Sequence, residues 1–157
     1  MSESEAGPDP LRRHDVLNHR RPLDVEAMGS ASAKLLGLHD FAAFCRLRNG
    51  ATTVRTLLQF SWRRHDAGEA DPGLVVATVA ADAFCHSMVR ALVGAVLPVG
   101  DLRRAADWPA RVLAARVRDS GVTVAAARGL TLERVDYPPD DQLAVRARAA
   151  RAVRHLP

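Results

Sequence analysis

The chain has 157 residues, a length that fits one domain with one sizeable hydrophobic core. Apolar residues make up 48% and charged residues 25%, which is typical of a globular protein. The net charge of +4 and the sequence pI of about 10 favour an anionic partner, nucleic acid first among them. Arginine supplies 21 of the 22 basic residues, which suits phosphate contacts and equally fits the bias of a GC-rich genome.

Several classes of protein are disfavoured by the sequence. Cys45 and Cys85 are too few for a metal cluster or a disulfide framework, and we expect two buried thiols in a cytoplasmic protein. The opening MSESEAGPDP is acidic and polar, unlike a signal peptide. Residues 83–100 are apolar but short for a membrane span. No phosphate-binding glycine loop, His-Glu-x-x-His motif or zinc spacing occurs, so we expect neither metal nor cofactor.

The first half of the chain predicts a linker, a helix and a hairpin. Residues 1–23 are polar and show no periodicity, which is typical of a linker. A helix is predicted from the N-cap Asp24 to Gly37, and a short turn capped by Asp40 follows within 38–45. Residues 53–64 and 74–84 are rich in β-formers and flank the turn-like HDAGEADPG, which predicts a β-hairpin.

The second half predicts two helices, a strand and a tail. Apolar residues within 83–100 recur at helical spacing, and a second helix is expected at 108–118. Arg90 and Gly94 lie one turn apart on another strip of the first helix, where the glycine allows a neighbouring backbone to approach closely. Residues 129–138 predict a third strand. The Ala/Arg-rich residues 139–157 predict a fraying helix. We therefore expect an α+β domain over 24–138, with an antiparallel sheet packed with helices.

Arg90 is the single formal charge in the apolar segment 83–100. An unpaired buried charge costs several kcal/mol, and arginine cannot give up its proton. The residues leave two hypotheses open for Arg90. Its stem reaches solvent, or it pairs internally with one of four acids: Asp40, Asp82, Glu133 or Asp136. The neighbours His86 and Ser87 suggest a polar pair at a helix terminus, because adjacent helical residues point apart.

Three blocks of sequence resemble the C-terminal half of bacterial tRNA pseudouridine synthase A. They are LDVEAMGSASAKLLGLHDFAAFCRLRNGATTVRTL, AFCHSMVRALVGAVLPVG and AARGLTLERVDYP, and the resemblance covers roughly residues 9–138. The middle block matches the specific family form Ala-Phe-x-His-x-Met-Val-Arg-x-x-Val-Gly. The resemblance implies the C-terminal half of the pseudouridine synthase fold. It also implies a homodimeric isomerase that converts uridine to pseudouridine in the tRNA anticodon arm (positions 38–40), without a cofactor.

The resemblance also implies roles for individual residues. The arginine matching Arg90 pairs with a catalytic aspartate and keeps it ionised, since an opposite charge within ~4–6 Å lowers a carboxylate pKa by ~1–3 units. Leu130 is implied to line the catalytic cleft, and the target uridine must leave its stack. Four residues near the expected cleft are candidates for RNA binding, although solvated surface side chains are an equally open interpretation: Arg46, Arg48, Arg55 and His86.

The chain departs from the family pattern at the nucleophile. The family's aspartate lies in a motif resembling Gly-Arg-Thr-Asp-x-Gly-Val-His-Ala in the N-terminal half, and neither that motif nor the tyrosine following it occurs here. RHDAGEA mimics part of the motif with Asp66, but it lies in the predicted hairpin turn, where Asp and Gly are ordinary. The resemblance therefore adds a third hypothesis, that Arg90 awaits an aspartate from a missing N-terminal half, and we expect the chain alone to be inactive. The alternatives are a non-catalytic RNA-binding remnant and one half of a two-chain assembly.

Overall fold

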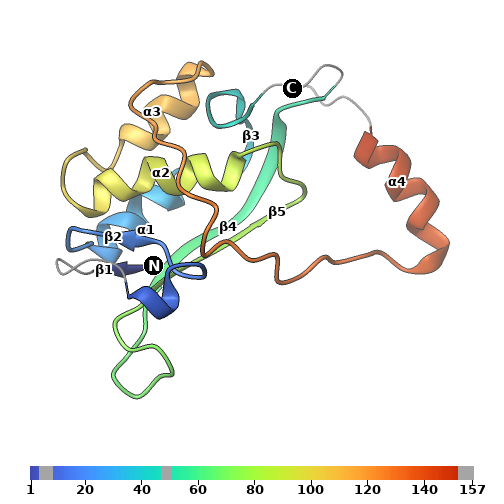
Figure 1. Cartoon of the computed structure of the whole chain (residues 1–157). Helices are drawn as coiled ribbons and strands as arrows, with labels where there is room; N and C mark the ends of the chain where they lie inside the picture. Colours follow the sequence, from blue (N-terminus) through green and yellow to red (C-terminus); the bar gives the residue numbers. More distant parts are fainter. Residues whose placement is uncertain (4–8, 47–50, 152–157) are drawn as a thin grey trace.

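The centre of the fold is a three-stranded antiparallel sheet in the order β3–β4–β5 (Figure 1). The computed structural model describes residues 1–3, 9–46 and 51–151. The strands are β3 (Gly37–Asp40), β4 (Val54–Arg64) and β5 (Val75–Ala81). Three helices pack with the sheet: α1 (Val25–Ala33), α2 (Met88–Gly100) and α3 (Trp108–Ala115). The predicted α+β class is confirmed.

The predicted hairpin is confirmed as β4 and β5, which pair from Leu57↔Ala81 to Arg64↔Val75. A register shift between Leu57 and Gln59 changes which side chains of β4 face the helices. Leu57 and Phe60 are buried, whereas Leu58 between them is 63% exposed. One extra residue in a strand turns the side chains that follow it to the opposite face of the sheet. The alternation of buried and exposed side chains along β4 is therefore interrupted.

Helix α1 begins where the sequence predicts and ends earlier. The Asp24 carboxylate accepts a hydrogen bond from the Ala27 N–H at 2.9 Å, which confirms the N-cap. The helix ends at Ala33, and Gly37, with φ of +104°, begins β3 instead of ending the helix. The sequence did not predict β3, which pairs with β4 over Gly37↔Leu57 to Asp40↔Val54. A 3-10 turn η2 (Ala42–Phe44) follows, and the Asp40 carboxylate accepts from the Ala42 N–H.

The hydrophobic core lies between the sheet and the helices. One buried polar contact crosses it: the Trp62 indole N–H of β4 donates to the hydroxyl of Ser32 in α1 at 2.8 Å. Ser32 is fully buried, so this bond satisfies two polar groups that have no access to water. The largest fully buried side chains include Phe41, Phe44, Met28, Leu35, Leu57, Met88 and Leu92.

Helix α2 confirms the prediction for the apolar segment, although it starts only at Met88. The expected close backbone approach at Gly94 is also confirmed. A Cβ built on Gly94 would overlap the backbone carbonyl of Thr123. The chain beyond α3 therefore crosses α2 at this point, as Figure 1 shows. Any side chain at position 94 would push that segment away from the helix.

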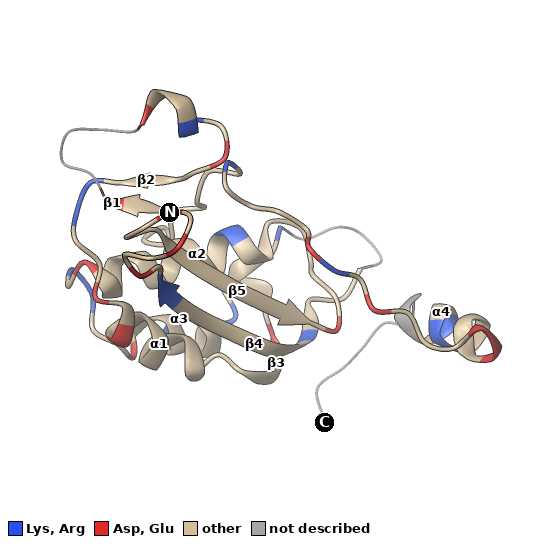
Figure 2. Cartoon of the chain, turned by 90° about the horizontal axis from the view of Figure 1, so that it is seen from below, with Lys and Arg blue, Asp and Glu red and all other residues tan. Residues whose placement is uncertain are grey.

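The third strand predicted at 129–138 is wrong. None of these residues belongs to a strand, and Leu130, Leu132, Val135 and Tyr137 are each at least 52% exposed. The alternating pattern is present, but this segment lacks the backbone pairing that makes a strand. Beyond it lie a 3-10 turn η3 (Asp140–Gln142) and helix α4 (Leu143–Arg151), which stands apart from the sheet in both views (Figures 1 and 2). Its described side chains are exposed.

The described residues of the predicted linker pack on the domain. Strand β1 (Ser2–Glu3) pairs in parallel with β2 (Asn18–His19), and a 3-10 turn η1 (Pro10–Arg12) lies between them in sequence. The Glu3 carboxylate binds the Arg64 guanidinium at 2.7 Å and accepts from the Leu23 N–H. Val16 and Leu23 are buried. The domain division at residues 23 and 138 stays a prediction. In the described ranges, no helix has the length and apolar character needed to cross a membrane.

Candidate functional site

Arg90 is held by the backbone of the segment that crosses α2. Its Nε–H donates to the carbonyl oxygen of Ala125 at 2.6 Å, and the Ala125 N–H donates to the carbonyl oxygen of Arg90 at 3.0 Å. One turn further along the helix, Gly94 leaves room for the carbonyl of Thr123. These contacts fix the Nε side of the Arg90 guanidinium, and the Arg90 residue is half-buried. The Nη edge is the part of a guanidinium that can bind a carboxylate end-on with two parallel bonds.

No carboxylate among the described residues forms an ion pair with Arg90. Asp40 accepts hydrogen bonds from Thr53 and from the Ala42 N–H, and Asp136 pairs with Arg134. The hypothesis of an internal partner is therefore wrong. Within the same residues, the two Nη groups of Arg90 make no hydrogen bond. The backbone therefore orients the Arg90 guanidinium, and its Nη edge stays available to bind a carboxylate.

Leu130 lies on the same segment as Ala125, just after Gly129. Gly129 has a φ of +77° and fits closely against the backbone of Asp15 and Leu17, which sets the direction of the chain at this point. The Leu130 side chain is 52% exposed. Its role in lining a cleft stays a prediction.

A hollow of about 300 Å³ lies at the start of α2. It brings together three of the four residues predicted to bind RNA: Arg46, Arg55 and His86. The fourth, Arg48, lies outside the described residues. The Arg46 N–H donates to the carbonyl oxygen of His86 at 2.9 Å, which joins two walls of the hollow. The remaining lining residues are Ala51, Thr52, Thr53, Phe84 and Cys85. We call this surface the basic hollow.

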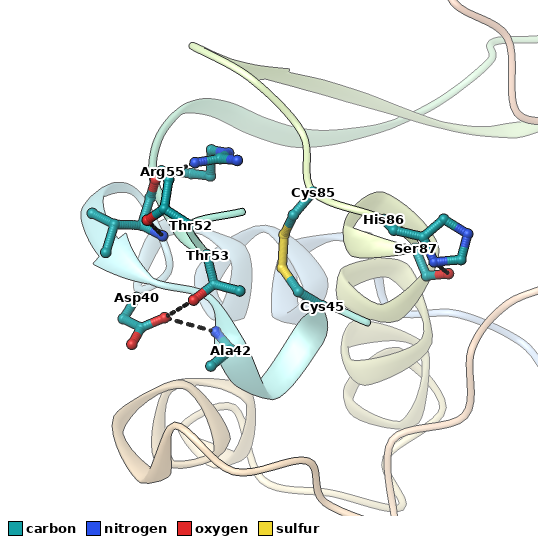
Figure 3. The surroundings of a disulfide bond; sticks show 10 residues. Asp40, Ala42, Cys45, Thr52, Thr53, Arg55, Cys85, His86 and Ser87 are labelled. Atoms are coloured by element: carbon teal, nitrogen blue, oxygen red, sulfur yellow. Dashed lines mark hydrogen bonds between the residues drawn. A yellow bond between two sulfur atoms is a disulfide. The ribbon is translucent and has the colours of Figure 1, made fainter. Parts of the chain in front are cut away.

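The basic hollow is bordered by a disulfide bond for which the sequence contains no local signal. Cys45 and Cys85, expected to be thiols, are joined in the structure with their Cα atoms 5.8 Å apart (Figure 3). This separation is ordinary for a disulfide. The pair was missed because 40 residues separate the two cysteines, and only the packing of η2 beside the start of α2 brings them together. The bond ties the Arg46 wall to the His86 wall.

The wall that carries Arg55 is fixed by a second set of contacts (Figure 3). The Thr53 hydroxyl donates to the Asp40 carboxylate at 2.5 Å, and the Phe41 N–H donates to the carbonyl oxygen of Thr53 at 3.0 Å. The Arg55 guanidinium donates to the carbonyl oxygen of Val54 at 2.6 Å. Asp40 therefore anchors this wall from the end of β3. The sequence offered no signal for this role beyond the predicted cap.

Neither the pair His86 and Ser87 nor the single residue Asp66 lies in a catalytic arrangement in the described part of the chain. His86 and Ser87 lie just before α2, with the Ser87 hydroxyl 3.4 Å from the His86 Nδ1, which confirms a polar pair at a helix terminus. Asp66 lies in the turn between β4 and β5, where its N–H donates to the Glu69 carboxylate. This turn precedes the start of β5, whereas the helix that carries Arg90 follows the other end of that strand, so the position of Asp66 disfavours a nucleophilic role.

Comparisons with a family profile and with individual proteins point to the same family. Residues 31–138 match the sequence profile of a family described as tRNA pseudouridine synthase. The chain is 57% identical over its full length to tRNA pseudouridine synthase A of Streptomyces griseus, of which it covers 54%. It is 59% identical to the protein of the same name from Frankia casuarinae, of which it covers 56%. The chain thus spans about half the length of these curated relatives.

Proposed function

The chain belongs to the tRNA pseudouridine synthase family, and from this premise we propose that it is the C-terminal half of such an enzyme. In this proposal Arg90 receives a catalytic aspartate supplied by the other half. The observation that carries it is the state of Arg90: its Nε is fixed by Ala125, and no described acid pairs with it. The chain covers only about half of each relative, which supports an enzyme whose aspartate and arginine lie in different halves.

The proposed reaction is the isomerisation of uridine to pseudouridine in the anticodon arm of tRNA. The target nucleotide leaves its stack so that the aspartate can reach it. Arg90 keeps that aspartate ionised, because an adjacent guanidinium favours the charged form. Leu130 lines the cleft. We propose that the complete enzyme is a homodimer, as the family resemblance implies, and that it works in the cytoplasm.

The basic hollow is proposed to bind the phosphate backbone of the tRNA. Arg46 is exposed, and with Arg55 and His86 it concentrates basic side chains around one concave surface. Cationic side chains that neutralise phosphates release counterions, which makes such binding dependent on salt. Arg48 follows Arg46 closely in sequence, and its contact with RNA stays a prediction.

The proposal is tested by restoring the enzyme from two parts. The chain is mixed with the region of the Streptomyces griseus relative that it does not cover, and pseudouridine in tRNA is measured. We expect no product from either part alone and product from the mixture. Product from the chain alone would overturn the proposal and would make Asp66 the first residue to substitute.

A second candidate function rests on one observation: the catalytic motif of the family does not occur in these 157 residues. The chain would then bind RNA without catalysis. Failure of the mixture to form product, together with tRNA binding that shows no preference for the anticodon arm, would favour this function over the first.

A further inference from the structure

The two cysteines of the disulfide differ in their surroundings. Cys45 follows η2 and is fully buried in the hydrophobic core beside Phe44. Cys85 is half-buried and lines the basic hollow. A reagent that enters the hollow therefore meets Cys85 and not Cys45.

The residues around Cys85 favour a reactive thiol in the reduced protein. The basic hollow places Arg46, Arg55 and His86 along the same surface as Cys85. Cationic neighbours stabilise the thiolate, which is the form of cysteine that attacks other sulfur atoms. Cys45 lies within bonding reach of Cys85 because the backbone around both residues is fixed, including the bond from the Arg46 N–H to His86. An accessible cysteine beside a buried one at disulfide distance is typical of a reacting and a resolving thiol.

We propose that Cys85 and Cys45 form a reversible dithiol–disulfide site that reacts with low-molecular-weight disulfides. The Cys85 thiolate attacks one sulfur of the small disulfide, which forms a mixed disulfide and releases one small thiolate. The Cys45 thiolate then attacks the Cys85 sulfur, which forms the Cys45–Cys85 bond and releases the second small thiol. In total the protein loses two protons and two electrons, which is two hydrogen atoms, and one small disulfide is reduced to two thiols.

The site does not depend on the proposed RNA function, because its chemistry is complete within this chain. The redox state of the two cysteines nevertheless decides whether two walls of the basic hollow are covalently linked. The bond covalently joins the segment before Arg46 to the segment before His86, in addition to the hydrogen bond between their backbones. In a reducing compartment such as the cytoplasm, disulfides are mostly transient or redox-sensing, which fits a site that opens and closes.

The test uses the purified full chain, reduced and then exposed to oxidised glutathione, with products followed by mass spectrometry. Wild-type protein should become two hydrogens lighter without keeping glutathione. Cys45→Ser should accumulate one glutathione on Cys85. Cys85→Ser should react more than ~10-fold more slowly, because a buried thiol reacts only after local opening. The double variant, which has no thiol, is the control and should not react.

A second measurement uses the wild-type chain, so its result does not depend on whether the variants fold. Reduced wild-type chain is treated briefly with iodoacetamide, and the modified peptides are mapped. We expect alkylation at Cys85 before Cys45, by more than ~10-fold, for the same reason of burial. Equal rates at the two cysteines, faster reaction at Cys45, or stable glutathione on wild-type protein would overturn the proposal.

Discussion

The carbonyl oxygen of Thr123 occupies the space where a side chain on Gly94 would begin. This close contact lays the segment after α3 directly against α2. Two residues further on, Ala125 exchanges backbone and side-chain hydrogen bonds with Arg90. Gly94 is thus a condition for the orientation of Arg90, since the crossing segment supplies the acceptor for its Nε.

The first prediction concerns this contact. Gly94→Ala should lower the free energy of unfolding by roughly 1–3 kcal/mol, because the new methyl group must displace backbone. The matched control is Gly29→Ala in α1, where a Cβ would meet no atom within 4 Å. It should raise stability by about 0.5–1 kcal/mol, the usual gain of alanine over glycine in a helix. Urea unfolding measures both, and changes of the same sign would contradict the described crossing.

The second prediction concerns the buried bond between Trp62 and Ser32. Ser32→Ala leaves the indole N–H without an acceptor and should cost about 1–3 kcal/mol of stability. Ser30→Ala, on an exposed position of the same helix, should change stability by less than ~0.5 kcal/mol. Thermal unfolding followed by circular dichroism distinguishes them. Equal effects of the two variants would mean that the bond contributes nothing.

The third prediction concerns stability at low pH. Burial acts to raise the pKa of Asp101, but hydrogen bonding and the charge of Arg103, together with a hydrogen bond to His19, outweigh it and lower the pKa below its ordinary value. A carboxyl whose pKa is lowered by folding stabilises the protein above its unfolded pKa of about 3.9 and loses that contribution as the pH falls through the folded value.

Wild-type protein should therefore lose stability below about pH 4 more steeply than Asp101→Asn. Urea midpoints across the acid range measure this difference. Glu69→Gln is the comparison, because Arg63 also lowers the pKa of Glu69, but that ion pair is more exposed. An exposed pair is screened by solvent and should change the acid slope less. Parallel curves for wild type and Asp101→Asn would exclude a stabilising role for the Asp101 contacts.

The fourth prediction concerns the basic hollow. Arg46→Gln should weaken tRNA binding and reduce the slope of log affinity against log salt by about 1, as expected for the loss of one phosphate contact. Arg118→Gln removes the same charge from an exposed position outside the hollow and should leave the slope nearly unchanged. Filter binding of tRNA at several salt concentrations measures both slopes. Indistinguishable slopes for the two variants would show that the basic hollow does not bind RNA.

Local signals in the sequence predicted much of the fold. The hairpin was predicted because two runs of β-formers flank a turn, and α2 because its apolar residues recur at helical spacing. The Asp24 cap and the role of Gly94 follow from local stereochemistry, and both are confirmed. These features depend on residues close together in the chain or on the special freedom of one residue type.

The features that were missed depend on distant partners. Strand β3 is short and exists through its pairing with β4, whereas residues 129–138 have a strand pattern but no strand pairing in the structure. The Cys45–Cys85 bond requires η2 to pack beside α2. At the candidate site, four residues were predicted near the cleft, namely Arg46, Arg48, Arg55 and His86, and the structure places all but Arg48, which lies outside the described residues, around one hollow. The sequence could not show that Ala125 orients Arg90.

The claim that Arg90 holds an aspartate ionised is tested most directly by the pH dependence of the restored enzyme. Pseudouridine formation by the mixture with the Streptomyces griseus region is measured against pH for wild type, Arg90→Gln and the control Arg118→Gln. Without the guanidinium the aspartate pKa rises, so Arg90→Gln should move the acidic limb of the rate profile to higher pH, while Arg118→Gln leaves it in place. An Arg90→Gln variant whose acidic limb stays at the wild-type pH would contradict the account.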